Sequence, residues 1–155
     1  MKSIILIAIL VFIDQISKIW TVISLKGNAP ITIINGVFEL TYVENTGVAF
    51  GIFANREYGS ILLSVFTGLV FLFILYFRYK LPLTKKYDTI RFVLSFLIAG
   101  ALGNLIDRIR LGYVIDMLHF YWFEFPVFNL ADSYIVVSTI VLIVLGLTKY
   151  RHLEI

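Results

Sequence analysis

The sequence predicts an all-α membrane protein with four transmembrane helices and a small extracytoplasmic β-sheet lying at the membrane interface. Three observations predict this fold class. The chain of 155 residues is 60% hydrophobic and only 15% charged, whereas a soluble domain carries about 25% charged residues. Its mean hydropathy is +0.94. Four stretches are long and apolar enough to cross a bilayer; no linker divides them, so we expect one multi-pass domain over residues 1–155.

The first span is expected at about 3–25. Lys2 ahead of an apolar run is also typical of a secretory signal peptide. However, no small-residue cleavage site follows, and the run continues through Asp14 and Lys18. We therefore interpret it as a retained helix. The other three spans are expected at about 58–77, 92–109 and 131–148.

The Lys and Arg residues near the span ends predict the orientation. One side would hold eight of them: Lys2, Arg78, Lys80, Lys85, Lys86, Arg91, Lys149 and Arg151. The other side would hold four: Lys26, Arg56, Arg108 and Arg110. The positive-inside rule therefore puts both termini in the cytoplasm, and most acidic residues fall on the outer side.

Two connections lie on that outer side. Within about 30–50, two β-branched runs flank Asn35-Gly36, a dipeptide that favours a tight hairpin turn. We expect the small sheet there, with its apolar face against lipid or the bundle. The connection at about 110–130 is rich in aromatic residues, which favour the headgroup region, so we expect it to lie at the interface.

The content of cysteine and histidine excludes several kinds of site. The chain has no cysteine, which rules out disulfides and cysteine-bound metals. Its two histidines, His119 and His152, lack the spacing of a zinc hydrolase. The net charge of +3 is explained better by the membrane topology, which gathers basic residues on the cytoplasmic side, than by binding to nucleic acid. We therefore expect no metal site of these kinds and no nucleic-acid partner.

Polar residues inside the spans form two groups. Asp14 and Lys18 are four residues apart on one helix face, and Asn104, Asp107 and Arg108 share a face of the third span. Either group is explained equally well by charge pairing that helps helices pack or by a functional site facing the bundle interior.

Asp116 and Asp132 are harder to explain structurally. Asp116 lies among apolar neighbours, with no Lys or Arg within five positions. Asn129 is placed to cap the last span, which would put Asp132 in the first turn, where the helix dipole favours an ionised carboxylate. A helix-start acid with no further role is the simpler alternative. Two converging carboxylates can act as general base and general acid, but spacing alone does not show that they converge.

The segment from Asn45 to Gly51 contains the glycines Gly47 and Gly51, which would allow another chain to approach closely. By itself it is more typical of an ordinary turn into a short helix. It is not a phosphate loop, since no Lys-Ser/Thr follows.

Two rival functions stay open on these residues alone. A Ser–Lys peptidase would use Lys18 as base and Ser60 or Ser133 as nucleophile, although nothing in the sequence places a serine beside Lys18. A small transporter would pass protons along buried charged side chains, although paired broken spans are not seen. That relay would consist of Asp14, Lys18, Asp107 and Asp116.

Five ordered blocks over essentially the whole chain resemble the lipoprotein signal peptidase (signal peptidase II) family of bacterial four-span aspartic peptidases. The blocks are Asp14-Gln15-x-x-Lys18, Asn45-x-Gly47-x-Ala49-Phe50-Gly51, Gly103-Asn104-x-x-Asp107-Arg108, Gly112-x-Val114-x-Asp116 and Phe128-Asn129-x-Ala131-Asp132. One position departs from the family pattern: Met117 stands where Phe is usual, which affects only the packing beside Asp116.

The resemblance implies that Asp116 and Asp132 are the catalytic pair. It implies further residues that shape the site or hold substrate: Asp14, Lys18, Asn45, Gly47, Asn104, Asp107, Arg108 and Asn129. Family members cut prolipoproteins just before a diacylglyceryl-modified cysteine and need no metal or cofactor. We therefore expect a monomer among the lipids of the bacterial cytoplasmic (inner) membrane, with its site near the extracytoplasmic face.

Overall fold

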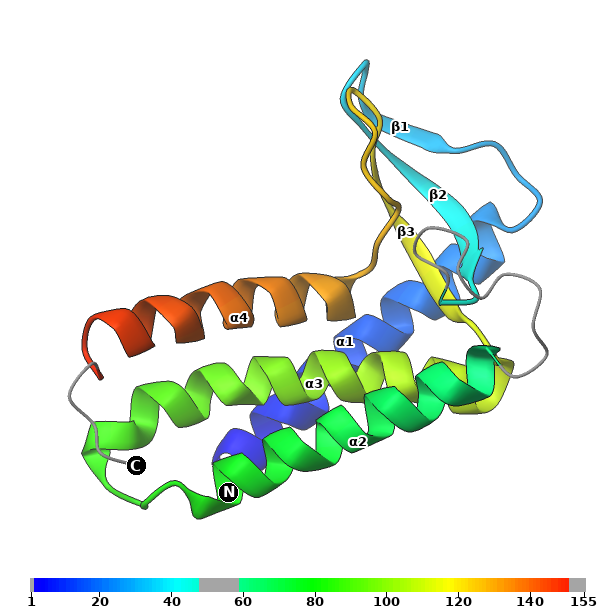
Figure 1. Cartoon of the computed structure of the whole chain (residues 1–155). Coiled ribbons are helices and arrows are strands. Elements are labelled where there is room, and N and C mark those ends of the chain that lie inside the picture. Colours follow the sequence, from blue (N-terminus) through cyan, green and yellow to red (C-terminus); the bar gives the residue numbers. More distant parts are fainter. Residues whose placement is uncertain (1, 48–58, 151–155) are drawn as a thin grey trace.

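The computed structural model describes residues 2–47 and 59–150. Four long helices lie side by side, and a small sheet stands at one end of them (Figure 1). The elements in chain order are α1 (Lys2–Leu25), β1 (Ile31–Ile34), β2 (Phe38–Asn45), α2 (Gly59–Lys80), the short 3₁₀ helix η2 (Lys85–Tyr87), α3 (Asp88–Leu111), β3 (Val114–Phe120) and α4 (Leu130–Leu147).

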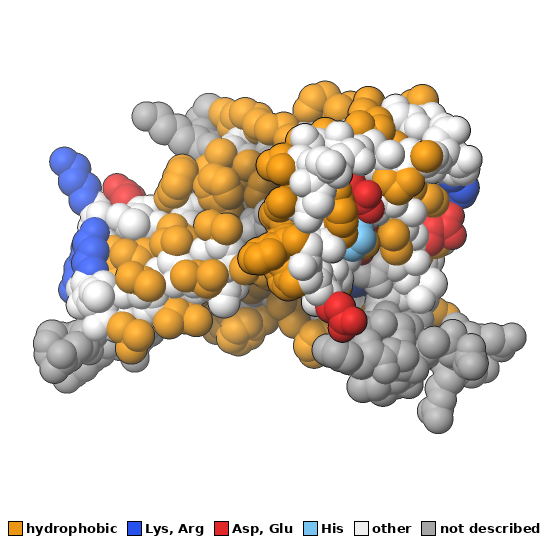
Figure 2. Space-filling model, turned by 90° about the horizontal axis from the view of Figure 1, so that it is seen from above, with side chains coloured by type: hydrophobic (Ala, Val, Ile, Leu, Met, Phe, Trp, Pro, Cys, Tyr) orange, Lys and Arg blue, Asp and Glu red, His pale blue; other side chains and the backbone are white. Residues whose placement is uncertain are grey.

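All four long helices have the length and composition of membrane spans, which confirms the predicted fold class. Their outer surfaces are apolar: Phe12, Phe73 and Leu147 are 65%, 68% and 70% exposed. Figure 2 shows hydrophobic side chains over the helical part of one face, with several Lys and Arg side chains at the end away from the sheet and another basic side chain beside acidic ones at the sheet end. Such a surface suits lipid rather than water.

Helix α3 is the central element, because it packs against α1, α2 and α4. Two of its glycines make close approach possible. A Cβ on Gly100 would lie 2.4 Å from the backbone oxygen of Ala131, and a Cβ on Gly103 would lie 2.5 Å from Oδ2 of Asp14. Small residues at these contacts therefore let α4 and α1 reach the backbone of α3.

The sheet is antiparallel, in the order β1-β2-β3. The predicted hairpin is confirmed: the N–H of Val37 donates to the carbonyl of Ile34 over 3.0 Å, and Gly36 adopts a φ of 75°. The third strand was not predicted, since the 110–130 connection was expected only as an aromatic interfacial segment. Val114, Ile115 and Met117 are all buried in it, so the alternation that reveals a half-exposed strand is missing.

The turn from α3 into β3 positions Asp116. Gly112 has a φ of 81°, and its N–H donates to the carbonyl of Arg108 over 3.0 Å, which ends the helix. Strand β3 then pairs with β2, with Asp116 opposite Val43. Strand β3, which carries Asp116, therefore follows directly on the last turn of α3, at the sheet end of the bundle (Figure 1).

Candidate active site

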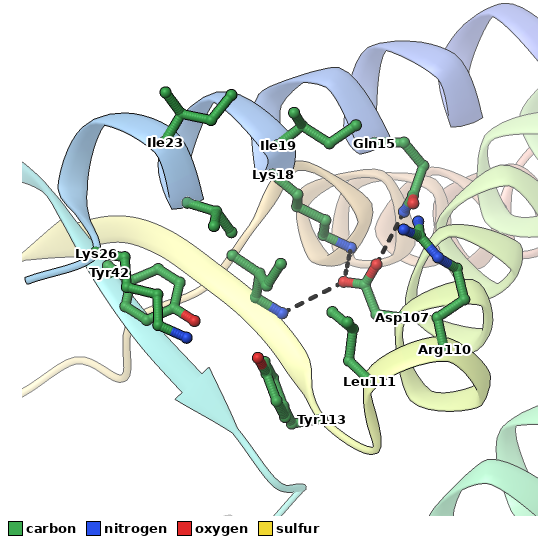
Figure 3. Close-up of a pocket in the computed structure, with 12 residues that line it drawn as sticks. Gln15, Lys18, Ile19, Ile23, Lys26, Tyr42, Asp107, Arg110, Leu111 and Tyr113 are labelled. Carbon is green, nitrogen blue, oxygen red and sulfur yellow. Dashed lines mark hydrogen bonds and ion pairs between the residues drawn. The ribbon is translucent and has the colours of Figure 1, made fainter.

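Lys18 is the centre of a buried charge cluster. Its Nζ lies 2.9 Å from Oδ2 of Asp14 and 2.9 Å from Oδ2 of Asp107, and it donates to Oδ1 of Asn104 over 3.1 Å. Figure 3 shows Lys18 and Gln15 both directed at Asp107. Three acceptors use all three donors of the ammonium group. This pairing compensates the cost of burying charge within the spans.

The two acids of this cluster also bond to other elements. Oδ1 of Asp14 accepts the backbone N–H of Ala131 over 3.0 Å, and Oδ2 of Asp107 accepts that of Ile115 over 3.3 Å. Gln15 donates to Oδ1 of Asp107 over 3.0 Å. The cluster therefore ties α1 to α3, to β3 and to the start of α4.

Asp116 is 1% exposed and accepts two side-chain hydrogen bonds. Nδ2 of Asn129 lies 2.6 Å from its Oδ1, and Nδ2 of Asn45 lies 2.8 Å from its Oδ2. The pKa of Asp116 is raised to about 6, mainly by burial and also by the nearby charge of Asp132, while the amide donors of Asn45 and Asn129 and the charge of Lys18 oppose the shift. A carboxyl with such a pKa can hold a proton and release it near neutral pH.

Asp132 lies in the first turn of α4 in a capping box with Asn129. The side chain of Asn129 accepts the N–H of Asp132 over 2.9 Å, and Oδ2 of Asp132 accepts the N–H of Asn129 over 3.2 Å. The predicted cap is confirmed.

Asn104 connects the charge cluster to Asp132. Its Oδ1 accepts from both Lys18 and Asn129, so its Nδ2 is left to donate to Oδ1 of Asp132 over 2.7 Å. An ammonium group can only donate, so Lys18 fixes which way round this amide lies. The arrangement brings the polar groups of α1, α3 and α4 into one hydrogen-bonded network.

Arg108 is half-buried and interacts electrostatically with Asp132, Asp116 and Asp107. Asn45 accepts the N–H of Gly47 over 2.8 Å, which orients its amide toward Asp116. The rest of that predicted glycine motif, positions 48–51, lies outside the described residues. All ten predicted site residues therefore lie in or beside this one network.

Residues that sequence reasoning gave no role also shape the site. Gln15 bonds Asp107 and the carbonyl of Gly103, and Gly100 and Gly103 leave room for α4 and Asp14. Gln15 and Gly103 lie within two of the sequence blocks that resemble the family, and this position was the sequence signal for their role in the site. Over residues 2–47 and 59–150, no group of three or more His, Asp or Glu side chains could hold a metal ion.

The geometry disfavours the serine–lysine alternative. Lys18 is fully bonded to Asp14, Asp107 and Asn104, and Ser133 donates its hydroxyl to the backbone carbonyl of Asn129. Ser60 has no described side chain. A buried carboxyl, Asp116, and a half-buried one, Asp132, joined through asparagine amides in a four-span bundle, are instead the arrangement of a membrane-embedded aspartic peptidase.

Comparison with known proteins agrees with this class. The family model described as signal peptidase (SPase) II matches residues 6–148, and the chain belongs to that family. It is 41% identical to a lipoprotein signal peptidase of Caldanaerobacter subterraneus, covering 90% of this chain and 92% of the relative. It is 42% identical to the lipoprotein signal peptidase of Clostridioides difficile, covering 92% of each.

A solved structure of a bacterial membrane enzyme superposes with a TM-score of 0.82 at 28% identity, covering 95% of this chain and 93% of that one. The lipoprotein signal peptidase family cleaves signal peptides from prolipoproteins, and this chain is one of its peptidases. The same membership establishes the bacterial, membrane-bound character that the composition predicts.

Proposed function

We propose that Asp116 and Asp132 are the catalytic pair, and that they cut diacylglyceryl-modified prolipoproteins just before the modified cysteine. The observation that supports this most is the side chain of Asn129, which bonds the carboxyl of Asp116 and caps the helix turn of Asp132. The whole chain, residues 1–155, would then form a single peptidase domain that works as a monomer.

The different environments of the two carboxyls suggest their roles. Asp132, at a helix N-terminus, is the ionised base: it takes a proton from water as the water oxygen attacks the scissile carbonyl. Asp116, with its raised pKa, donates its proton to the carbonyl oxygen. When the C–N bond breaks, a proton held by the pair passes to the leaving amine, and the re-formed carbonyl returns the other proton to the pair. Both carboxyls titrate as one coupled unit.

The neighbouring residues would support these two roles. Asn45 and Asn129 hold both oxygens of Asp116, and Asn104 holds Asp132. The positive charge of Arg108 would limit the repulsion between the two acids and stabilise negative charge on the substrate. The buried cluster of Asp14, Lys18 and Asp107 would hold α1, α3, β3 and the start of α4 together. The backbone N–H of Gly47 would orient the side chain of Asn45.

We also propose that both termini are cytoplasmic and that the site lies near the extracytoplasmic face. The Lys and Arg count and the position of the sheet support this orientation. Because the chain has no cysteine, single cysteines can be introduced and labelled. The reagent is a membrane-impermeant maleimide, applied to cells whose cytoplasmic membrane is intact and directly accessible. It should label Ile33→Cys on β1 and leave Leu83→Cys, beyond α2, unlabelled. The opposite pattern would invert the topology.

The substrate proposal is tested with purified protein in detergent and a prolipoprotein prepared with and without its diacylglyceryl group. Gel mobility should report cleavage of the lipidated form alone, and Ser60→Ala should cleave it at the wild-type rate. Equal cleavage of both forms would remove the lipid requirement. Loss of activity in a folded Ser60→Ala protein would favour the serine–lysine mechanism.

A further inference from the structure

Arg78 lies in the last turn of α2, at the end of the bundle away from the sheet (Figure 1). It is half-buried and stands four residues after Ile74, on the same face of the helix. Ile74 belongs to the hydrophobic core between α2 and α3, together with Leu81, directly after α2, and Leu94 of α3. The stem of Arg78 therefore lies at the packed face of α2 and not on its lipid-facing side.

The Nε atom of Arg78 is buried and has no hydrogen-bond partner. Among the described residues 2–47 and 59–150, it is the one buried side-chain nitrogen or oxygen in this condition. The guanidinium group interacts electrostatically with Arg91, which is a like charge. An arginine cannot lose its charge, and a buried donor without an acceptor is unfavourable. The described part of the chain therefore leaves this donor for an acceptor from outside.

Arg91 and the acid beside it are already bonded to each other. Nη1 of Arg91 donates to the carbonyl of Pro82 over 2.6 Å, and its Nη2 donates to the carbonyl of Thr84 over 3.4 Å and pairs with Asp88. Asp88 is the one acidic residue between positions 76 and 91. The same segment holds five basic residues: Arg78, Lys80, Lys85, Lys86 and Arg91. Positive charge is therefore in excess around the unpartnered donor.

The connection from α2 to α3 is held in place by the end of α4. The hydroxyl of Tyr150 donates to the carbonyl of Lys86 over 2.6 Å, and its ring stacks on Tyr87 with centroids 6.4 Å apart. Nζ of Lys149 donates to Oγ1 of Thr89 over 3.4 Å. The basic side chains are thus presented from a preformed surface, which lowers the entropy lost when a ligand binds.

Membrane topology alone does not explain this arrangement. The positive-inside rule needs only basic side chains near the span ends, and the exposed residues Lys80, Lys85 and Lys86 meet that need. It does not require a guanidinium group with a buried, unpartnered N–H at the packed face of a helix. A bound anion that reaches this face would explain it.

The depth of Arg78 in the bilayer indicates which anion is available. Tyr76 and Tyr79, in the same part of α2, are 60% and 84% exposed, and exposed tyrosines are typical of the headgroup region. The commonest anion at that depth is the phosphodiester of a phospholipid. A guanidinium group can offer two parallel N–H donors to a phosphate.

We propose that Arg78 and the basic residues around it bind the phosphodiester of an anionic phospholipid, in the leaflet at the end of the bundle away from the sheet. Basic pockets between spanning helices bind such headgroups in other membrane proteins. An anionic headgroup is favoured over a zwitterionic one, since the cation of the latter would meet basic residues and an acid already paired with Arg91. This site shares no residue with the proposed catalytic pair and its network.

Thermal unfolding of the delipidated protein in detergent tests the site without any cleavage reaction. Phosphatidylglycerol should raise the unfolding midpoint more than phosphatidylcholine does at the same mole fraction. Arg78→Met should weaken the apparent affinity for phosphatidylglycerol by about tenfold, the order expected for one hydrogen bond to a charged group. Lys85→Met removes the same charge from an exposed position. At physiological ionic strength it should weaken the affinity by less than about twofold, because that charge is screened.

Detergent without lipid provides the second measurement. There Arg78→Met should unfold at the wild-type temperature or above it, because methionine removes the unpartnered donor. A lower midpoint would mean that Arg78 is bonded within the protein, and the inference would fall. Equal protection of the wild type by both lipids, or equal losses of affinity in the two variants, would also overturn it. Inorganic phosphate at the same concentration should protect less than phosphatidylglycerol; equal protection would assign the site to a free anion instead of a lipid.

Discussion

The side-chain nitrogen of Asn129 lies 2.6 Å from Oδ1 of Asp116, and the oxygen of the same amide accepts the backbone N–H of Asp132. Asn129 is completely buried. One amide therefore holds a carboxyl on β3 and the first turn of α4 in a fixed relation, and it does so without placing a charge between them.

Replacing Asn129 by Ala should shift the pH–rate profile. The amide donor lowers the pKa of Asp116, so its loss lets Asp116 keep its proton to higher pH. The alkaline limb of kcat/KM should move up by about one pH unit, the equivalent of one hydrogen bond to a charged group. Asn28→Ala is the matched control, because Asn28 is exposed and its side chain donates to the carbonyl of Ser24, away from both aspartates. A limb that stays in place in folded Asn129→Ala protein would contradict the role assigned to this amide.

Asp116 should also give the protein a measurable pH dependence of stability. The pKa of Asp116 rises from its ordinary value of 3.8 to about 6 in the folded protein. Between these two pH values the folded protein therefore keeps a proton that the unfolded chain releases. Stability from this group is therefore present below pH 4 and lost as the pH rises through about 6. The loss is about 3 kcal/mol. Thermal unfolding in detergent, compared between wild type and Asp116→Asn from pH 4 to 7, should show a steeper decline in the wild type. Parallel curves would contradict the raised pKa.

Gly103→Ala should destabilise the bundle. The added Cβ would lie 2.5 Å from Oδ2 of Asp14, and this carboxylate is held by Lys18, so it cannot move aside freely. We expect a loss of about 1–3 kcal/mol, as for other overpacked cores. Gly146→Ala is the control in α4, where a Cβ meets nothing within 4 Å, and it should leave stability unchanged or slightly raised. Equal unfolding midpoints for the two variants would show that α1 is not pressed against α3 here.

Lys18→Met should be among the most damaging single changes. It leaves Asp14 and Asp107 buried without their cation, which costs about 3–5 kcal/mol in comparable cases. Adding Asp107→Asn should recover part of this loss. Lys26→Met removes an exposed pair with Glu44 and should leave the unfolding midpoint in place. An unfolding midpoint of Lys18→Met equal to that of the wild type would contradict the role assigned to this ammonium group.

The spans and the start of the last helix could be predicted because each leaves a local signal, whereas the set of site residues came from the resemblance to a family. Long apolar runs identify the helices, and Asn129 followed by Asp132 is recognisable as a helix start. What no local pattern contains is the meeting of the Asp14–Lys18 pair with Asn104, which lies 86 residues beyond Lys18 and is joined to it only by packing of α1 on α3.

The third strand could not be predicted for a different physical reason. Positions 114–117 of β3 are buried, and Asp116 is held there by Asn45 and Asn129 rather than by solvent. With both faces covered, the strand lacks the alternation of polar and apolar residues that marked β1 and β2. The aromatic residues that follow it were interpreted only as membrane-interface groups, whereas Phe128 also bridges back to Leu118 of the strand.

The central claim is that Asp116 and Asp132 carry the chemistry, and single-turnover cleavage of a lipidated prolipoprotein tests it most directly. Asp116→Asn and Asp132→Asn should each lower the rate by at least about a thousandfold while binding the substrate and unfolding cooperatively. Asp88→Asn, at the opposite end of the bundle, should cleave at the wild-type rate. If either of the first two variants, correctly folded, keeps a rate within tenfold of wild type, the catalytic pair is assigned to the wrong residues.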